Sequence, residues 1–218
     1  MYKSSFFRKA EYKLGKFAIP NLMAVIVGAM ALVYILDLMF LNRLGDTLSS
    51  HFVFDRAAIL SGQIWRIITF ALIPPDRSII FIIFSLYFFW MMGSALENEW
   101  GAFRFNIFYL CGIVGTIIAG LIAGSVTNLY LNLSLFFAFA LFYPEFELML
   151  FFVLPVKIKY LAIADLVLFG YSFAVGSMAD RVAILVAFSN IALFFGADFI
   201  AQIKKWKRNR DIKKRFKK

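Results

Sequence analysis

The chain has 218 residues, of which 62% are hydrophobic and only 17% are charged, and its mean hydropathy is +0.81. Soluble domains average about 25% charged residues, so the composition excludes an ordinary soluble domain, and apolar runs of about twenty residues indicate that lipid is the solvent for most of the chain. The net charge of +10 is uneven, because Lys204 to Lys218 holds ten Lys or Arg residues against one acidic residue. A single cysteine, Cys111, excludes an intramolecular disulfide and leaves the redox compartment open.

The basic tail directly follows an apolar segment. In a membrane protein this arrangement is typical of a segment that fixes orientation and rests on anionic lipid headgroups, so we expect lipid rather than nucleic acid as its partner. At the other end, Tyr2 to Lys16 is polar and basic, and the apolar run that follows is too long for a cleavable signal peptide. We therefore expect the protein to keep its first helix.

Six apolar segments are candidates for membrane-spanning helices. A bilayer core of about 30 Å needs roughly 20 helical residues, which sets the expected length of each. In chain order the candidates are Ala18 to Leu41, Ser78 to Leu96, Phe103 to Ala123, Leu129 to Tyr143, Ile158 to Val175 and Asp180 to Gln202. The fourth would be only about 22 Å long as a helix, so we place it in the middle of the bundle. The predicted organisation is a cytoplasmic N-terminal segment (1–17), a six-helix membrane domain (18–202) and a basic cytoplasmic tail (203–218).

Two connections are too long or too apolar to be free loops. Asn42 to Arg77 has mixed character and includes the semi-apolar stretch Ala57 to Ile73, so we expect it to contain interfacial helices. Phe146 to Lys157 combines apolar residues with Pro155 and is too short to span. We expect this second connection to lie at the membrane surface.

Basic residues are distributed unevenly between the two sides of a six-span arrangement. Eighteen of the 23 Lys and Arg residues fall on the side that holds both termini, and five fall on the other side. Because cytoplasmic loops carry the excess of Lys and Arg, the count predicts that both termini are cytoplasmic. The number of spans is then even, six or four.

The third span carries a stripe of small residues. Its members are four residues apart and share one helical face: Gly112, Thr116, Gly120 and Gly124. Such a stripe lets a neighbouring backbone approach closely, and we favour packing within the bundle over a dimerisation face. In the sixth span, Ala192 and Gly196 offer a shorter notch of the same kind.

Two short motifs have the chemistry of structural anchors. Trp65 and Arg66 adjoin in the first loop, where an indole suits headgroup depth and a guanidinium can bond loop carbonyls or lipid phosphate. After the second span, Glu97 and Arg104 would form a charge pair that holds the turn between two antiparallel helices. Both motifs predict a structural rather than a catalytic role.

Taken together, these segments resemble the rhomboid superfamily. The features that carry the resemblance are Trp65-Arg66 in a long first loop, a second span that ends in Gly and then Glu97, Trp100-Gly101 with Arg104 after it, and a central fourth segment from Phe139 to Pro144 that continues into Leu154 to Ala162. The resemblance covers about residues 20 to 200. It implies an all-α, polytopic bundle of six transmembrane helices with a long interfacial first loop and a short central fourth helix.

The resemblance also implies a chemistry that this sequence lacks. Active rhomboids are intramembrane serine proteases with a Gly-x-Ser-Gly nucleophile at the start of the fourth span and a catalytic His in the sixth. Ser134 is present here, but it lacks both glycines and sits several residues deeper. Where the imidazole is expected, the sixth span offers Ser189 and Asn190, and an amide cannot act as a general base. The one histidine, His51, falls in the first loop, where we expect it to be solvated.

Apart from Asp180 at the start of the sixth span, the acidic residues of the predicted spans are Asp37, Asp165 and Asp198. Asp165 is about eight residues into the fifth span, so we expect it to face the bundle interior or a partner, in a structural role or in the movement of a proton or ion. The sequence has no Cys/His cluster with metal-ligand spacing and no glycine-rich phosphate loop. We therefore predict no metal and no cofactor.

Three functions remain open from the sequence. By resemblance, rhomboid-like proteins without the catalytic residues, the derlins among them, bind membrane-protein clients or thin the nearby bilayer, and this pseudoprotease function is the leading prediction. The first alternative is an intramembrane serine protease with a degenerate site built on Ser134. The second is a small solute or proton carrier that uses Asp165.

Overall fold

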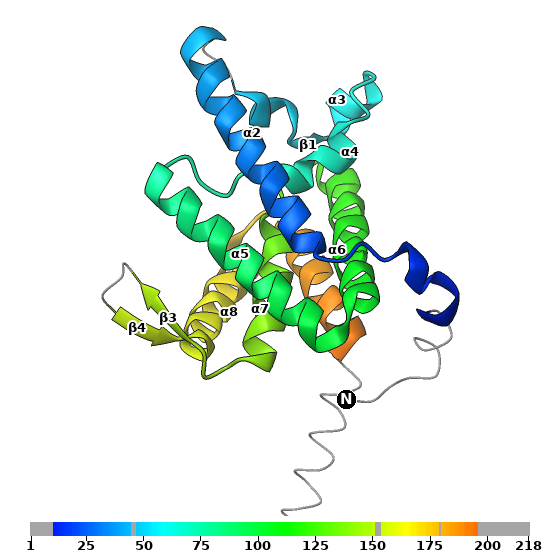
Figure 1. Cartoon of the computed structure of the whole chain (residues 1–218). Helices are drawn as coiled ribbons and strands as arrows, with labels where there is room; N and C mark the ends of the chain where they lie inside the picture. Colours follow the sequence, from blue (N-terminus) through cyan, green and yellow to red (C-terminus); the bar gives the residue numbers. More distant parts are fainter. Residues whose placement is uncertain (1–10, 45–46, 151–153, 179, 196–218) are drawn as a thin grey trace, which may run out of the picture.

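The computed structural model describes residues 11–44, 47–150, 154–178 and 180–195, which form a helical bundle with two small sheets (Figure 1). The longer helices are α2 (Leu22–Leu44), α5 (Ile79–Trp100), α6 (Ala102–Ala123), α7 (Leu129–Phe142) and α8 (Ile158–Val175), and residues 180–195 form a last helix. The short helical segments are η1 (Gly15–Phe17), η2 (Leu48–His51), α3 (Arg56–Leu60), α4 (Arg66–Thr69) and η3 (Phe70–Leu72). The strands are β1 (Phe54–Asp55), β2 (Ser125–Val126), β3 (Glu147–Leu150) and β4 (Leu154–Lys157).

Within the described residues, four helices are long and apolar enough to cross a membrane. They are the helical stretch Glu11–Leu41, which includes most of α2, and the helices α5, α6 and α8. α7 is apolar but shorter, and the last helix is described only for residues 180–195. A mostly helical bundle of the membrane type is thus confirmed, and the count of six spans stays a prediction.

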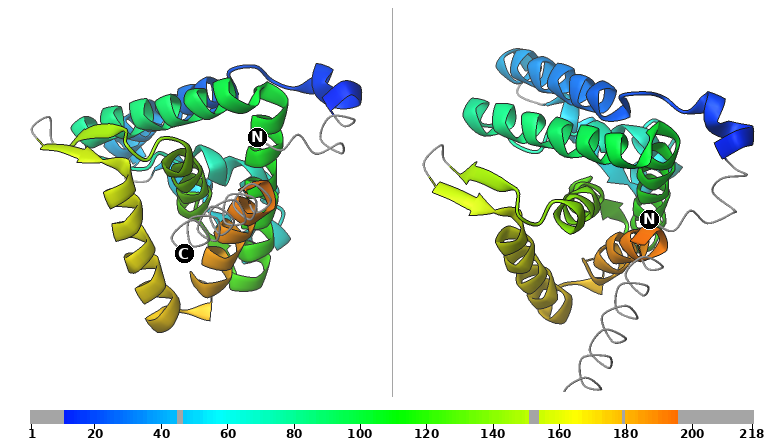
Figure 2. Two further views of the ribbon diagram at one scale, coloured as in Figure 1. Left: turned by 90° about the horizontal axis from the view of Figure 1, so that it is seen from below. Right: turned by 60° about the horizontal axis from the view of Figure 1, so that its bottom comes forward.

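α7 lies inside the bundle, between α5, α6, α8 and the last helix (Figure 2). Ten of its 14 residues are buried. A helix of this length reaches only about 21 Å and cannot cross a hydrocarbon core of about 30 Å, so cover by neighbouring helices is the arrangement that its length predicts.

Aromatic side chains fill the end of the bundle where α5 meets α6. The ring of Trp100 lies 5.4 Å from Phe108, 5.5 Å from Phe142 and 5.2 Å from Phe195, measured between ring centroids. Edge-on and tilted pairs of this kind are the arrangements that aromatic rings prefer. One indole therefore joins α5, α6, α7 and the last helix.

The connection between α5 and α6 is shorter than the sequence predicts. The sequence predicts that the second span ends at Leu96, but α5 continues as a helix through Trp100. Gly101 alone joins the two helices, with a φ of 85° that glycine adopts readily. Because α5 is longer than predicted, Trp100 lies on this helix and in the aromatic cluster.

The first loop is a packed unit that contains short helices, as its length predicts. β1 pairs antiparallel with β2, and Phe54 lies opposite Val126, so the loop is tied to the end of α6. Phe54 is fully buried and packs edge-on against Phe70, with 6.1 Å between the ring centroids.

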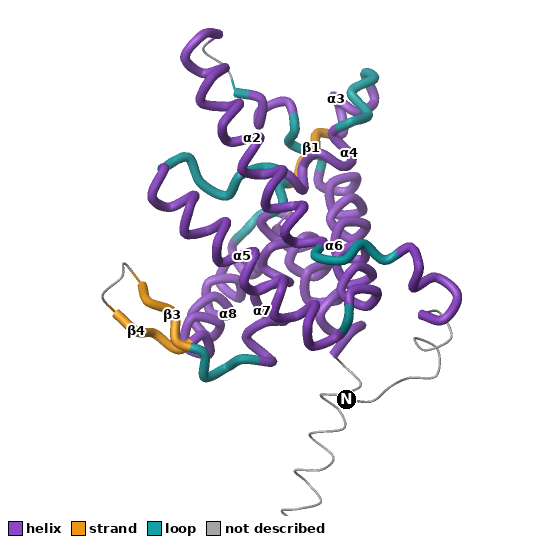
Figure 3. Tube along the Cα trace, viewed as in Figure 1, coloured by secondary structure: helices purple, strands orange, loops and turns teal. Residues whose placement is uncertain are grey.

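The segment from Phe146 to Lys157, for which the sequence predicts no helix, contains the strands β3 and β4. It forms an antiparallel hairpin in which Leu148 of β3 lies opposite Val156 of β4 (orange strands in Figure 3). A hairpin pairs backbone groups internally, which favours it where water is scarce, and Pro155 disfavours a continuous helix. The expected position of this segment at the membrane surface stays a prediction.

Candidate functional site

Ser134 and Asn190 meet in the interior of the bundle. α7 supplies Ser134 and the last helix supplies Asn190, and their exposed fractions are 1% and 4%. Asn190 Nδ2 lies 3.4 Å from Ser134 Oγ and 3.4 Å from the carbonyl oxygen of Phe108 in α6, and it donates to both. The Ser134 hydroxyl in turn donates to the carbonyl oxygen of Leu131 at 2.8 Å. Ser134 and Asn190, which the sequence analysis compared with the serine and histidine of active rhomboids, are therefore in contact.

Gly112 of α6 makes this close approach possible. A Cβ atom added to Gly112 would lie 2.5 Å from Leu131 Cδ1 and 3.2 Å from Asn190 Nδ2. Thr116, one turn further along, is buried and donates from its hydroxyl to the Gly112 carbonyl at 2.8 Å. This part of the small-residue stripe packs inside the bundle.

The other small residues have different surroundings. Gly120 faces the first loop, where an added Cβ would lie 2.5 Å from the ring of Phe54. Gly124 ends α6 with a φ of 94° and has nothing within 4 Å of an added Cβ, so it terminates the helix rather than packing it. Ala192 is exposed, and Gly196 lies outside the described residues, so the second notch is not part of the internal packing seen here.

The chemistry around Ser134 is that of a packing contact. The Asn190 amide donates to the serine, whereas a catalytic base must accept the serine proton, and neither end of an amide is basic enough to do so. The buried oxygens Asn132 Oδ1 and Asn190 Oδ1 have no hydrogen-bond partner among the described residues. The described residues contain no group of three or more His, Cys, Asp or Glu side chains that could hold a metal ion.

Arg66 organises the first loop. It is 8% exposed, and its Nη1 donates to the carbonyl oxygens of Ser50 and Val53 at 3.0 and 2.8 Å, while its Nε donates to Gln63 Oε1 at 2.7 Å. The sequence left loop carbonyls and lipid phosphate open as partners. In the structure the guanidinium bonds loop carbonyls.

Trp65 lies beside it with a different orientation. Its side chain is about half exposed, and Nε1 donates to the carbonyl oxygen of His51 at 3.2 Å. The indole thus has an apolar exposed surface and a satisfied N–H, which suits the interface between lipid and water.

In the structure Glu97 and Arg104 do not pair with each other, and each has another partner. Glu97 Oε1 accepts a hydrogen bond from the backbone N–H of Asn21 at 2.7 Å. Arg104 Nε lies 3.9 Å from Glu11 Oε2. The predicted hinge pair is therefore replaced by two contacts that hold the segment before α2 against the ends of α5 and α6.

The acidic residues of the predicted spans do not converge on one site. Asp165 lies half-buried on α8, and the described residues give it no hydrogen-bond or ion-pair partner. Asp37 of α2 accepts two hydrogen bonds from Ser49, one from its backbone N–H at 2.9 Å and one from its hydroxyl. Asp198 lies outside the described residues.

Two asparagines that tie segments together were missed by the sequence reasoning. Asn106 of α6 donates to the carbonyl oxygen of Ile19 and accepts from the Ile19 N–H, both at 2.9 Å. Asn128, just before α7, donates to the carbonyl oxygen of Ile73 at 2.8 Å. A polar side chain in or beside an apolar run is costly in lipid unless it is bonded, and that signal could have found both residues.

An apolar groove, which we call the lateral groove, lies between the segment before α2, the first loop and α6. Its volume is about 510 Å³, and its walls include Ile26, Leu72 and Leu110. Leu110 is 59% exposed. Tyr109 also belongs to this wall, and its hydroxyl is buried and has no hydrogen-bond partner among the described residues.

No protein-family model matches the chain, and no curated protein is detectably similar to it.

Proposed function

We propose that the chain is a rhomboid-like membrane protein without protease activity, which binds membrane-protein clients or perturbs the nearby bilayer. The observation that carries the proposal is the hydrogen bond from Asn190 Nδ2 to Ser134 Oγ in the buried centre of the bundle. General-base help is worth typically 10² to 10⁴ in rate, and the amide supplies none. The serine hydroxyl is also occupied by the Leu131 carbonyl, as in an ordinary helical serine.

The lateral groove supports the client-binding part of the proposal. It is apolar, it has exposed residues such as Leu110 on its wall, and it carries one buried hydroxyl, that of Tyr109, without a partner among the described residues. Helices associate in lipid through close packing and interhelical hydrogen bonds rather than through a hydrophobic force. A transmembrane segment of a client with a hydrogen-bond acceptor at the depth of Tyr109 would pack closely in the groove and accept a hydrogen bond from the Tyr109 hydroxyl.

The protease question is tested with the purified full chain in detergent and then in liposomes. We expect no labelling by fluorophosphonate probes and no cleavage of generic transmembrane substrates, for the wild type and for Ser134→Ala alike. An active rhomboid protease in the same preparation serves as the positive control. Labelling or cleavage that is lost in Ser134→Ala would establish the degenerate protease instead.

The client-binding part is tested by photocrosslinking from inside the membrane. A photoreactive residue at Leu110 should crosslink transmembrane segments of other proteins, and one at Leu168, which is 60% exposed on α8, is the matched control. Tyr109→Phe removes only the hydroxyl and should lower the yield from Leu110. Equal yields from Leu110 and Leu168, unchanged by Tyr109→Phe, would contradict a client site in the lateral groove.

We also propose that both termini face the cytoplasm, supported by the 18 to 5 distribution of basic residues. Ser61 is an exposed residue of the first loop and can report on which side of the membrane this loop lies. In a Cys111→Ala background, a cysteine at Lys213 should react with an impermeant reagent only from the cytoplasmic side and one at Ser61 only from the opposite side. Labelling of both from one side would refute this orientation.

A further inference from the structure

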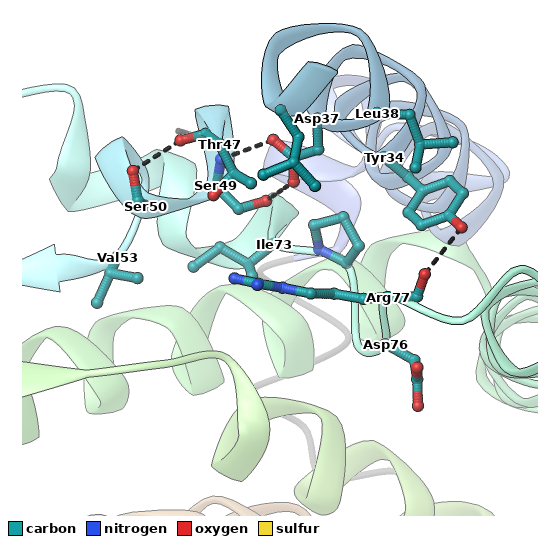
Figure 4. Close-up of a pocket in the computed structure, with 12 residues that line it drawn as sticks. Tyr34, Asp37, Leu38, Thr47, Ser49, Ser50, Val53, Ile73, Asp76 and Arg77 are labelled. Atoms are coloured by element: carbon teal, nitrogen blue, oxygen red, sulfur yellow. Dashed lines mark hydrogen bonds between the residues drawn. The ribbon is translucent and has the colours of Figure 1, made fainter. Parts of the chain in front are cut away.

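A second pocket lies where α2 ends and α5 begins, at the opposite end of α5 from the aromatic cluster; we call it the loop pocket (Figure 4). Its volume is about 220 Å³. Three segments form its walls: the last turns of α2, the first loop around η2, and the chain just before α5.

Hydrogen bonds hold these three segments together. The Tyr34 hydroxyl of α2 donates to the carbonyl oxygen of Arg77 at 3.0 Å, which fixes the chain before α5 against α2. Asp37 of α2 accepts from the backbone N–H of Ser49 at 2.9 Å and from the Ser49 hydroxyl, which fixes the first loop against the same helix. The pocket is therefore a built cavity rather than a gap between loose segments.

The pocket carries charges of both signs. Figure 4 shows the Arg77 side chain running across it below Asp37 and Ser49, and the described residues give the guanidinium no hydrogen-bond or ion-pair partner. Asp37 supplies a carboxylate, whereas the Asp76 carboxylate points away from Asp37 in Figure 4 and accepts a hydrogen bond from the Ser78 N–H at 2.8 Å. Although Ser49 bonds both oxygens of Asp37, each carboxylate oxygen has a second lone pair for another donor.

The rest of the pocket wall is apolar and continues onto the outside of the bundle. Leu38 and Leu41 belong to the wall and are 40% and 47% exposed. On α5, the exposed Ile79 and Ile83 extend the apolar surface away from the pocket. A ligand with a charged head in the pocket and apolar chains along these helices would match both regions.

We propose that the loop pocket binds a phospholipid of the surrounding bilayer through a phosphoethanolamine headgroup. The phosphate lies on the Arg77 guanidinium, whose planar fork suits phosphate oxygens, and the ammonium lies beside Asp37. The acyl chains follow Leu38 and Leu41. A headgroup with only negative charge would face the Asp37 carboxylate, and a choline headgroup has no N–H to donate to it. This proposal does not depend on client binding or on the absence of protease activity.

The test measures lipid binding to the purified, delipidated full chain by native mass spectrometry. Dioleoyl lipids with ethanolamine, choline and glycerol headgroups are titrated separately. We expect the ethanolamine lipid to bind about fivefold more tightly than the other two, and Arg77→Gln to weaken its binding about tenfold. Asp37→Asn should lower binding of the ethanolamine lipid to the level of the choline lipid, without weakening the glycerol lipid.

Arg56→Gln is the matched control, because Arg56 belongs to the first loop but lies outside the pocket and donates to the Leu121 carbonyl. It should leave all three affinities unchanged. If Arg77→Gln or Asp37→Asn lowers the thermal midpoint, the milder variant Arg77→Lys decides the result: it keeps the charge but removes the planar fork, so ethanolamine-lipid binding should weaken. Equal affinity for the three lipids, or ethanolamine-lipid binding that the pocket variants do not change, overturns the proposal. Tightest binding of the glycerol lipid, lost in Arg77→Gln, also overturns it, since the site would then be a simple anion site.

Discussion

α7 and α8 are both strongly apolar helices, but their surroundings are opposite. Ten of the 14 residues of α7 are buried, against two of the 18 residues of α8 (yellow in Figure 1). In a bilayer the lipid tails are as apolar as a protein core, so hydrophobicity does not decide which helix is buried. Length decides more, because α8 reaches about 27 Å and can face lipid, whereas α7 reaches about 21 Å and needs protein around it.

Polar side chains on the two helices also have different surroundings. Ser134 of α7 is buried and hydrogen-bonded on both sides, so it contributes to packing between α7 and the last helix. Asp165 of α8 is half-buried and has no partner among the described residues. Packing within the bundle therefore accounts for Ser134 but does not account for Asp165.

The largest expected effect contrasts one leucine on each helix. Leu135 of α7 is fully buried and Leu168 of α8 is 60% exposed. We expect Leu135→Ala to lower the free energy of unfolding by about 2 kcal/mol, the lower end of the range for this substitution, since the packing loss remains while lipid reduces the transfer term. Leu168→Ala should stay within about 0.5 kcal/mol of the wild type. Unfolding in mixed micelles with increasing SDS measures both, and equal losses would show that α8 is covered as α7 is.

A second, smaller contrast uses two glycines. An added Cβ at Gly112 meets Leu131 and Asn190, and Leu131 is itself buried and cannot swing away. Gly170 of α8 has nothing within 4 Å of an added Cβ. We expect Gly112→Ala to cost about 1 kcal/mol through overpacking, the lower end of the range for such changes. Gly170→Ala should be neutral, or stabilising by up to about 1 kcal/mol through helix propensity.

The same SDS unfolding series checks the glycine pair, with intrinsic tryptophan fluorescence, to which Trp100 of the aromatic cluster contributes, as the signal. A Gly112→Ala variant as stable as the wild type would mean that the close contact of α6 with α7 and the last helix is absent in solution.

Helix positions were predictable from the sequence because apolar length and helix breakers define them. α8 begins at Ile158 and ends at Val175, as predicted, and α7 ends one residue earlier than expected. The conformations of connections were less predictable. The hairpin of β3 and β4 and the helical continuation of α5 to Trp100 depend on which backbone groups find partners, and single-chain periodicity does not show that.

Contacts between distant residues were the least predictable part. The partners of Glu97 and Arg104 lie on the segment before α2, more than 75 residues away, and no local spacing points to them. Small residues other than the predicted stripe also turned out to matter, because an added Cβ at Gly93 would lie 2.3 Å from Met23. The contact of Ser134 with Asn190 was not predicted, because no residue spacing connects α7 with the last helix.

The smallest expected effect concerns how α8 is joined to α7. Between them, Glu145 accepts hydrogen bonds from Lys157 Nζ at 2.8 Å and from Lys159 Nζ, which closes the base of the hairpin at the start of α8. These hydrogen bonds lower the pKa of Glu145 from its ordinary value of 4.5 to about 2. Because the folded-state pKa lies below the unfolded value, the contribution of Glu145 to stability is fully present above about pH 4.5 and is lost as the pH falls toward 2.

We expect the ¹³C signal of the Glu145 carboxyl to titrate near pH 2, and Lys157→Met to move the midpoint back toward 4.5. Glu147→Gln, on the same hairpin, is the matched control and should leave the Glu145 midpoint close to that of the wild type. The effect on stability should be small, because Glu145 is solvent-exposed and exposed ion pairs are screened and entropically costly. A Glu145 midpoint near 4.5 in the wild type would show that the hairpin base is open in solution, so that α8 is held by its apolar contacts, the burial of Ile158 and Ala162 among them.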